Sequence, residues 1–210
     1  MLPYSAETHL DLLLSYNSLI QPLQITGYLT TVFLLVLLLW PRGNSDRLVV
    51  GLLALGWGWT GYAYLVATLS EVNWGAYVFG AAFGVEALLL LWSGTLRGNL
   101  RLRGDRSAAS WAGLFFILFA LAVYPGVPLL LGHEWQTLQH VGTAPAPTVI
   151  LTIGVLLLAA ERTPVHLLAI PVIWSIADGA TAWALGLWWD LSLPAAGMAA
   201  VFLSIVRPRV

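Results

Sequence analysis

Long apolar runs separated by short polar connections dominate this sequence. Seven runs can be delimited: residues 24–40, 47–69, 74–96, 108–131, 148–160, 164–186 and 191–206. Most are close to the ~20 residues that a helix needs to cross a bilayer core of ~30 Å. The shortest, residues 148–160, is about 20 Å of helix at ~1.5 Å per residue. The pattern predicts an all-α, polytopic membrane protein built as a bundle of seven transmembrane helices.

The first 24 residues are more polar than the runs that follow. Ser5 is a candidate helix N-cap, Glu7 falls in the first turn, and Pro22 ends the pattern. One helical face carries Leu10, Leu13 and Leu14. We expect residues 1–24 to form a short amphipathic helix in the membrane interface, followed by a single transmembrane domain over residues 25–206.

The arginines test the number of spans. Every basic residue of the chain is an arginine, and with seven spans each one falls in a connection on the same side. They are Arg42, Arg47, Arg97, Arg101, Arg103, Arg106, Arg162, Arg207 and Arg209. Basic residues of short loops are retained in the cytoplasm, so this distribution predicts an N-terminus outside and a C-terminus inside. Six spans would place Arg162 or the last two arginines on the wrong side.

Composition narrows the functional classes. Hydrophobic residues make up 59% of the chain and charged residues 9%, whereas a soluble domain is roughly half apolar and a quarter charged. The chain has no cysteine, which excludes disulfides, thiolate metal ligands and cysteine nucleophiles. It has no lysine to form a Schiff base. A phosphate loop, a Ser-His-Asp set and an HExxH motif are absent from the sequence as well, so no enzyme class is indicated.

Two carboxylates, Glu86 and Asp178, fall near the centres of predicted spans. A charge at that depth costs several kcal/mol, so each side chain should face the bundle interior or be protonated. No arginine is deep enough to pair with either acid. The functional interpretation is an ion or proton site, or an anchor for a polar substrate. The structural alternative is a pair of carboxyl groups that lock helices together through Tyr, Trp or Thr partners.

Aromatic residues are expected around these acids. Trp174 precedes Asp178 by four residues and therefore shares its helix face. Other deep aromatic residues either line a pocket for a flat apolar ligand or a cation, or fill the bundle core. Those assigned to the candidate site are Trp57, Tyr62, Tyr64 and Tyr77.

The longest outer connection holds three candidate metal ligands: His133, Glu134 and His140. Two imidazoles and a carboxylate suffice for zinc or copper in principle, although their spacing matches no established metal signature. The same connection ends with Pro145 and Pro147, directly before the shortest apolar run. Such a loop either dips into the outer leaflet, where protein must shield its backbone, or lies on the surface.

Short motifs along almost the whole chain resemble an uncharacterised family of bacterial integral-membrane proteins, a domain of unknown function. They are Tyr16-Asn17 with Pro22, Trp57-Gly58-Trp59 with Gly61 and Tyr64, Asn73 with Ala76-Tyr77-x-Phe79-Gly80, Tyr124-Pro125, Gly132-His133, Pro145-x-Pro147-Thr148, Ile170-Pro171-x-x-Trp174-Ser175 and Asp190. The chain departs from the family pattern at Gln21, Leu65, Ala146 and near Glu86. The resemblance implies a shared fold but supplies no activity.

These features favour a small-solute or ion permease of the bacterial cytoplasmic membrane, with Glu86 and Asp178 near the midplane. Its expected partners are the lipid bilayer and a small molecule or ion, not nucleic acid, and no cofactor is required. Two alternatives stay open. One is a non-catalytic subunit of a larger membrane complex, or a homo-oligomer. The other is a membrane-embedded enzyme or metal-handling protein with zinc or copper at the outer histidines.

Overall fold

The computed structural model describes residues 3–132, 134–160 and 164–206, which form an all-α bundle. The α-helices are α1 (Ala6–Leu39), α2 (Ser45–Trp59), α3 (Ala76–Leu90), α4 (Ala108–Leu118), α5 (Val127–Leu130), α6 (Pro145–Leu157), α7 (Val165–Leu185) and α8 (Ser192–Val206). Short π-helical or 3₁₀ segments extend or link them: η1 (Thr60–Val66), η2 (Leu69–Glu71), η3 (Leu91–Leu96), η4 (Phe119–Val123), η5 (Tyr124–Gly126), η6 (Trp135–Thr137) and η7 (Trp188–Leu191).

Five continuous helical stretches of the described chain are long and apolar enough to cross a membrane. They are Ser45–Glu71, Ala76–Leu96, Ala108–Leu130, Val165–Leu185 and Trp188–Val206. The two halves of α1, Ala6–Gln21 and Leu23–Leu39, pass the same test only together, and an 81° bend separates them. The helical, multi-span character is therefore confirmed, whereas the count of seven spans and the orientation of the termini stay predictions.

The outer surface of the bundle is apolar along its length. Large side chains exposed on it include Leu55, Leu88, Trp111, Ile173, Ile176 and Phe202. Water would make such a surface aggregate, whereas acyl chains solvate it. This surface and the membrane-length helices together define a multi-pass membrane protein.

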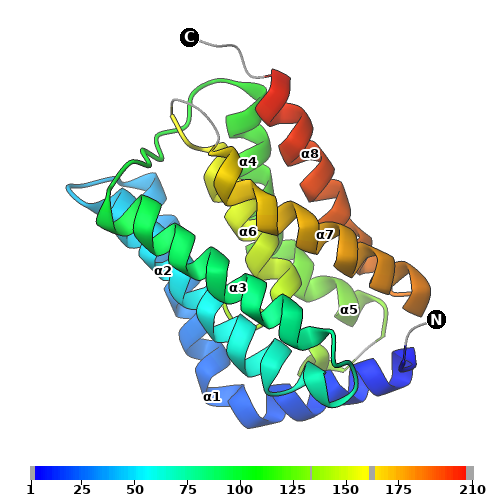
Figure 1. Ribbon diagram of the computed structural model, residues 1–210. Helices are drawn as coiled ribbons and strands as arrows, with labels where there is room; N and C mark the ends of the chain where they lie inside the picture. The colour runs from blue at the N-terminus through cyan, green and yellow to red at the C-terminus, as the bar shows by residue number, and fades with distance from the viewer. Residues whose placement is uncertain (1–2, 133, 161–163, 207–210) are drawn as a thin grey trace.

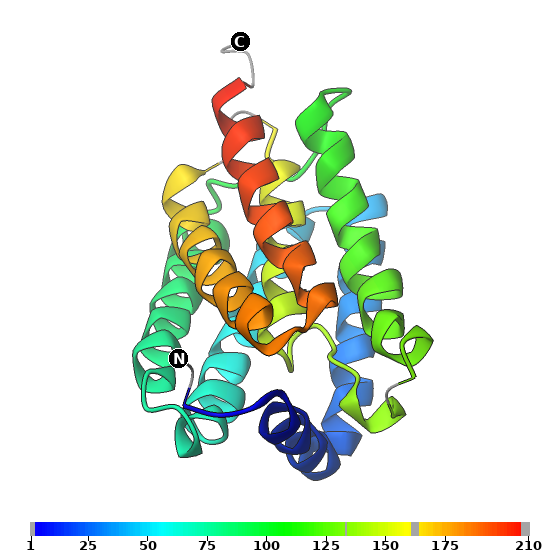
Figure 2. The same cartoon turned by 90° about the vertical axis from the view of Figure 1, so that its right-hand side faces the viewer.

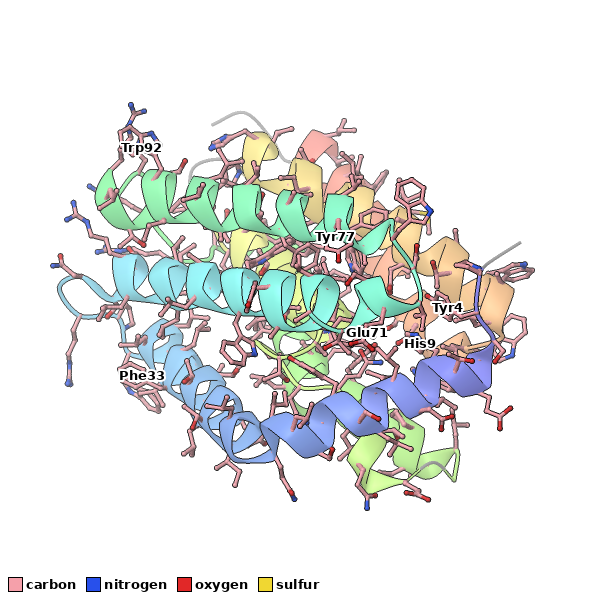
Figure 3. All side chains as sticks on the ribbon, turned by 60° about the horizontal axis from the view of Figure 1, so that its bottom comes forward. Tyr4, His9, Phe33, Glu71, Tyr77 and Trp92 are labelled. Carbon is pink, nitrogen blue, oxygen red and sulfur yellow. The ribbon has the colours of Figure 1, made fainter. Side chains whose placement is uncertain are left out.

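The first half of α1 lies across one end of the bundle (Figures 1 and 3). Ser5 caps the helix as expected, because its hydroxyl accepts a hydrogen bond from the Thr8 backbone N–H at 3.2 Å. Pro22 has no backbone N–H to donate to the preceding turn, and such a gap permits a sharp bend. The helix expected over residues 1–24 is present, and its placement in the membrane interface stays a prediction.

Helix α6 occupies the centre of the bundle (Figure 1), and all of its residues from Pro145 to Leu157 are buried. It contacts α2, α4, α7 and α8, and Figure 2 shows α8 between α4 and α7 in front of it. Pro145 and Pro147 also remove two of the backbone N–H groups that a helix start leaves unbonded. Protein rather than lipid therefore surrounds α6, which explains how so short an apolar helix fits here.

The two ends of the bundle differ in charge. The end at which α2, α4 and α7 begin, uppermost in Figure 1, holds every described arginine, and we call it the arginine end. These are Arg42, Arg47, Arg97, Arg101, Arg103 and Arg106. There the connection after η3 is tied to the end of α6, because the Ala160 N–H donates to the Arg101 carbonyl at 2.8 Å. The opposite end, which we call the N-terminal end, carries the first half of α1, Glu71 and the connection over residues 131–144.

Candidate functional site

Two aspartates come together near the N-terminal end. Asp178 lies in the last two turns of α7, and Asp190 lies in η7, where it is 6% exposed. Between them Gly186 adopts φ 72°, the left-handed conformation that ends many helices and that glycine tolerates best. This turn folds the chain back, and the two carboxyl groups interact electrostatically.

Two buried tyrosines complete the group. The Tyr124 hydroxyl donates a hydrogen bond to Asp190 Oδ1, and the Gln139 side-chain oxygen lies 3.5 Å from the same hydroxyl. Tyr64 interacts electrostatically with both aspartates, Asp178 and Asp190. We call Tyr64, Tyr124, Asp178 and Asp190 the acid–tyrosine cluster. Four separate elements, η1, η5, α7 and η7, supply its members.

Departures from regular α-helix position both tyrosines. Tyr64 lies inside the π-helical segment η1, and Tyr124 directly follows the π-helical segment η4. Each π-turn adds a residue to the helical repeat and so rotates every later side chain relative to an unbroken α-helix. Such turns occur frequently at functional sites. Here two of them lead to hydroxyl groups at the same aspartate pair.

The N-terminal segment covers the cluster. The Tyr16 ring packs edge-on against the Tyr64 ring at 5.2 Å, and the Tyr16 hydroxyl donates to the Thr143 carbonyl at 2.8 Å. Burial and then the Asp178 carboxyl raise the pKa of Tyr4, while a hydrogen bond with Asn73 lowers it. Tyr4 therefore lies near the aspartates, and Figure 3 shows it beside the start of α1.

Asn17 fastens this cover to the connection over residues 131–144. Its side-chain nitrogen donates to the backbone carbonyls of Gln136 at 2.6 Å and Leu138 at 2.9 Å. The Gln24 side chain in turn donates to the Asn17 oxygen at 2.7 Å. We call the first half of α1 together with residues 134–144 the cap. Nothing in the sequence pattern assigned Tyr16 or Asn17 a role, although both belong to the motifs that carried the family resemblance.

An aromatic layer crosses the bundle on the side of the cluster that faces the arginine end. The Phe83 ring lies 4.3 Å from the Trp57 ring and 5.1 Å from the Trp174 ring, and Phe79 lies 5.1 Å from Trp174. We call these four residues the aromatic layer. Trp57 is fully buried, and its ring N–H donates to the Thr152 hydroxyl on α6 at 2.8 Å. Trp57 and Trp174 are thus core residues, as one of the two sequence interpretations held.

Glu86 lies on the other side of this layer from the aspartates. It follows Phe83 by three residues on α3, about 4.5 Å towards the arginine end. Asp178 follows Trp174 by four residues on the antiparallel α7, about 6 Å towards the N-terminal end (Figure 1). The structure thus brings Asp178 together with Asp190 rather than with Glu86. Asp190 directly precedes the apolar run over residues 191–206, and the sequence analysis did not assign it to the candidate site.

Two of the expected lining residues point away from this interior. Tyr62 is 69% exposed and Tyr77 is 56% exposed. Tyr62 stands two residues before the buried Tyr64, and such a step turns a helical side chain to the opposite face. Figure 3 shows Tyr77 on the outside of α3. Neither takes part in the acid–tyrosine cluster.

The structure leaves the outer metal site a prediction. His133 lies outside the described residues, Glu134 is exposed, and His140 is half-buried with its ring 6.4 Å from the Tyr28 ring. Burial lowers the pKa of His140. In the described part of the chain, His, Asp and Glu side chains form no group of three that could hold a metal ion.

An all-α bundle with membrane-length apolar helices and buried polar groups places this chain among multi-pass membrane proteins. A model of a family of unknown function, DUF6064, matches residues 6–210. The chain belongs to this family, which confirms the resemblance seen in its motifs. No curated protein and no solved structure matches the chain.

Proposed function

We propose that this protein is a permease for a small cation in the bacterial cytoplasmic membrane, and that Asp178 and Asp190 are its cation-binding pair. The observation that carries the proposal is the acid pair itself. The two carboxyl groups interact within one cluster, in which Asp190 is buried and Asp178 is half-buried, while the described arginines are all at the other end of the bundle. Two neighbouring carboxylates without a basic partner repel each other, and a bound proton or cation relieves that repulsion.

The donor atoms around the pair also suit a cation. The Tyr124 hydroxyl contacts Asp190 and lies near the Gln139 side-chain oxygen, so the cluster offers oxygen ligands only. Oxygen is the ligand atom that hard cations prefer. The faces of the surrounding aromatic rings attract positive charge as well.

The predicted topology gives the site a direction. With the arginine end in the cytoplasm, the acid–tyrosine cluster lies near the outer surface beneath the cap. The aromatic layer then separates it from the cytoplasmic half of the bundle. In this arrangement the second half of α1 and the short central α6 complete seven crossings. A cation enters by displacement of the cap and leaves past the aromatic layer.

Flux measurements test the proposal. Liposomes that hold the purified protein are given external ²²Na⁺ or ⁸⁶Rb⁺, and cation uptake is followed with and without an outward proton gradient. We expect uptake of one of these cations to exceed that of empty liposomes, and we expect Asp178→Asn and Asp190→Asn to abolish the excess. The matched control is Asp11→Asn, an exposed aspartate at the same end. Flux equal to that of empty liposomes for every cation would refute the permease, and wild-type flux in both folded variants would refute Asp178 and Asp190 as its cation-binding pair.

A further inference from the structure

Three unsatisfied polar side chains lie close to the aromatic layer. Thr60 and Glu86 are fully buried, and Trp174 is 5% exposed. The Thr60 hydroxyl, both Glu86 carboxyl oxygens and the Trp174 ring nitrogen have no hydrogen-bond partner among the described residues. Buried polar groups in folded proteins are nearly always hydrogen-bonded, so each exception needs an explanation. The three groups lie on η1, α3 and α7, and α3 packs against both of the other elements, so unsatisfied polar groups lie on α3 and on two of its neighbours.

The backbone supplies a fourth polar group, the Leu167 carbonyl, close to the aromatic layer. Pro171 is a buried proline inside α7, and without a backbone N–H it leaves the Leu167 carbonyl without its usual helical donor. Pro171 is three residues from Trp174, and Glu86 is three residues from Phe83, in both cases towards the arginine end. Because Phe83 and Trp174 are in ring contact, Glu86 and Pro171 lie at a similar depth.

Glu86 has no charged neighbour in this region. The elements packed against α3 are α2, η1, η2, η3 and α7. Their described titratable groups are Asp46, Arg47, Tyr62, Tyr64, Glu71, His166 and Asp178. Tyr64 and Asp178 belong to the acid–tyrosine cluster, and the others stand near element ends or on the outer surface. None of them exerts a notable electrostatic effect on the Glu86 carboxyl. His166, the nearest basic group on α7, is exposed and contacts Ser93, two turns beyond Glu86.

We propose that Glu86 is a proton-exchange site, an uncharged carboxylic acid at rest that releases and regains its proton during the working cycle. A carboxylate buried without a partner is far less stable than the neutral acid, so the resting group keeps its proton. Release breaks the Glu86 O–H bond, leaves the carboxylate, and passes the proton to water at the arginine end. Thr60 and Trp174, on two elements that pack against α3, hold donors that have no partner among the described residues.

The coupling of this exchange to the Asp178–Asp190 pair rests on the proposed function. A cation bound to the pair adds a positive charge to the interior of the bundle. This charge lowers the free-energy cost of forming the negative Glu86 carboxylate, and Glu86 releases its proton. The net charge inside the protein is then conserved. The proton thereby becomes the ion that moves opposite to the cation.

A chemical-labelling experiment tests whether Glu86 is protonated, and it requires no transport measurement. Dicyclohexylcarbodiimide is an apolar reagent that takes the carboxyl proton on one nitrogen and bonds its central carbon to the carboxyl oxygen. Acyl transfer to nitrogen then leaves a stable N-acylurea. We expect peptide mapping by mass spectrometry to find this adduct on Glu86 of the wild-type protein in liposomes, with a yield that falls as the pH rises. Because the wild-type protein is labelled, this test does not depend on whether a Glu86 variant folds.

Two variants complete the test. Glu86→Gln should lose the adduct at this position, whereas Glu71→Gln, which changes an exposed glutamate, should be labelled like the wild type. In the flux assay, Glu86→Gln should abolish the response of cation uptake to an imposed pH gradient. Absence of the adduct from wild-type Glu86 would overturn the proton site, and a wild-type pH response in Glu86→Gln would overturn the coupling. If no cation gives flux above that of empty liposomes while Glu86 is labelled, the permease fails and the proton site stands.

Discussion

Tyr124 donates a hydrogen bond to Asp190 across 66 residues of sequence. Tyr124 lies near the end of the membrane-length stretch Ala108–Leu130, and Asp190 lies near the start of the stretch Trp188–Val206. The hydrogen bond joins these two stretches beneath the cap. The carboxyl group of Asp190 has no basic partner at that end of the described bundle, so Tyr124 is its main fixed donor. The geometry of the acid pair therefore depends on a tyrosine that belongs to neither acid's own helix.

Removal of that hydroxyl should weaken both stability and flux. We expect Tyr124→Phe to cost about 1–3 kcal/mol, because the Asp190 carboxyl loses its donor in a buried site. Chemical denaturation in mild detergent measures the loss, and the liposome assay measures flux. Tyr62→Phe makes the same substitution at an exposed tyrosine and serves as the control. Equal stability of the two variants would show that the bond to Asp190 contributes nothing.

Trp57 and Thr152 should behave as a coupled pair. Their hydrogen bond joins α2 to the central α6, and both side chains are fully buried. We expect Trp57→Phe and Thr152→Val each to cost about 1–3 kcal/mol. Thr152→Val leaves the Trp57 N–H without its acceptor, whereas after Trp57→Phe the Thr152 hydroxyl keeps only its bond to the Thr148 carbonyl. The double variant should cost less than the sum, because it leaves no unpaired Trp57 N–H. A double-mutant cycle with strictly additive energies would contradict this assignment; Trp74→Phe, at an exposed tryptophan, gives the baseline.

Stability should fall in mild acid because of His140. Burial lowers the pKa of this residue in the folded protein, so near pH 6 the unfolded chain binds more protons than the folded one. Stability is therefore fully present above the unfolded pKa of about 6.5 and is lost as the pH falls below it, by at most about 1.4 kcal/mol per pH unit. His140→Gln should reduce the slope of unfolding free energy between pH 7.5 and 5.5. His166→Gln, at an exposed histidine, should leave it unchanged.

The cap should loosen when Asn17 is changed. Asn17→Ala removes both hydrogen bonds to the backbone of residues 131–144. We expect faster hydrogen–deuterium exchange in that connection and in the first half of α1, with little change in α6. Asn44→Ala is the matched control, because Asn44 is exposed and its side chain makes no capping bond. Unchanged exchange over residues 131–144 would show that other contacts hold the cap.

Close packing around α6 should make two glycines intolerant of substitution. A Cβ at Gly113 would lie 2.7 Å from the Gly154 carbonyl, and one at Gly154 would lie 2.8 Å from the Gly113 carbonyl. Gly113→Ala should therefore destabilise the protein by about 1–3 kcal/mol through forced separation of α4 and α6. Gly126→Ala, where the added methyl group meets no neighbour, should be close to neutral. The two melting temperatures in the same detergent make the comparison.

The positions of the helices could be predicted from the sequence, but the inward faces of those helices could not. Apolar run length indicates a helix whatever its rotation. In lipid, however, Leu88 on the outside and Leu90 on the inside carry the same chemistry, so α3 has no polar stripe to set its rotation. Tyr62 and Tyr64 illustrate the result, because both were assigned to the interior and only Tyr64 lies there.

Asp178 and Tyr64 were predicted as site residues, but their grouping with Tyr124 and Asp190 was not, for two further reasons. The π-turns before Tyr124 and around Tyr64 change the helical register, and no residue pattern marked them. In the sequence Asp190 stands outside the apolar runs, twelve residues after Asp178, so no helical spacing relates the two acids. In the structure the turn at Gly186 folds the chain back and brings Asp190 to Asp178. By contrast, a buried glutamate at residue 86 was foreseeable, since a carboxyl group in the middle of an apolar run has few other places to go.

The enclosure of α6 bears on how the protein is made. This helix is too short to span a bilayer alone, and in the finished protein its neighbours are α2, α4, α7 and α8. When residues 145–157 leave the ribosome, two of those four neighbours have not yet been synthesised. The central helix therefore reaches its place by assembly with later helices rather than by independent partition into lipid, and biogenesis is complete only when the last span has arrived.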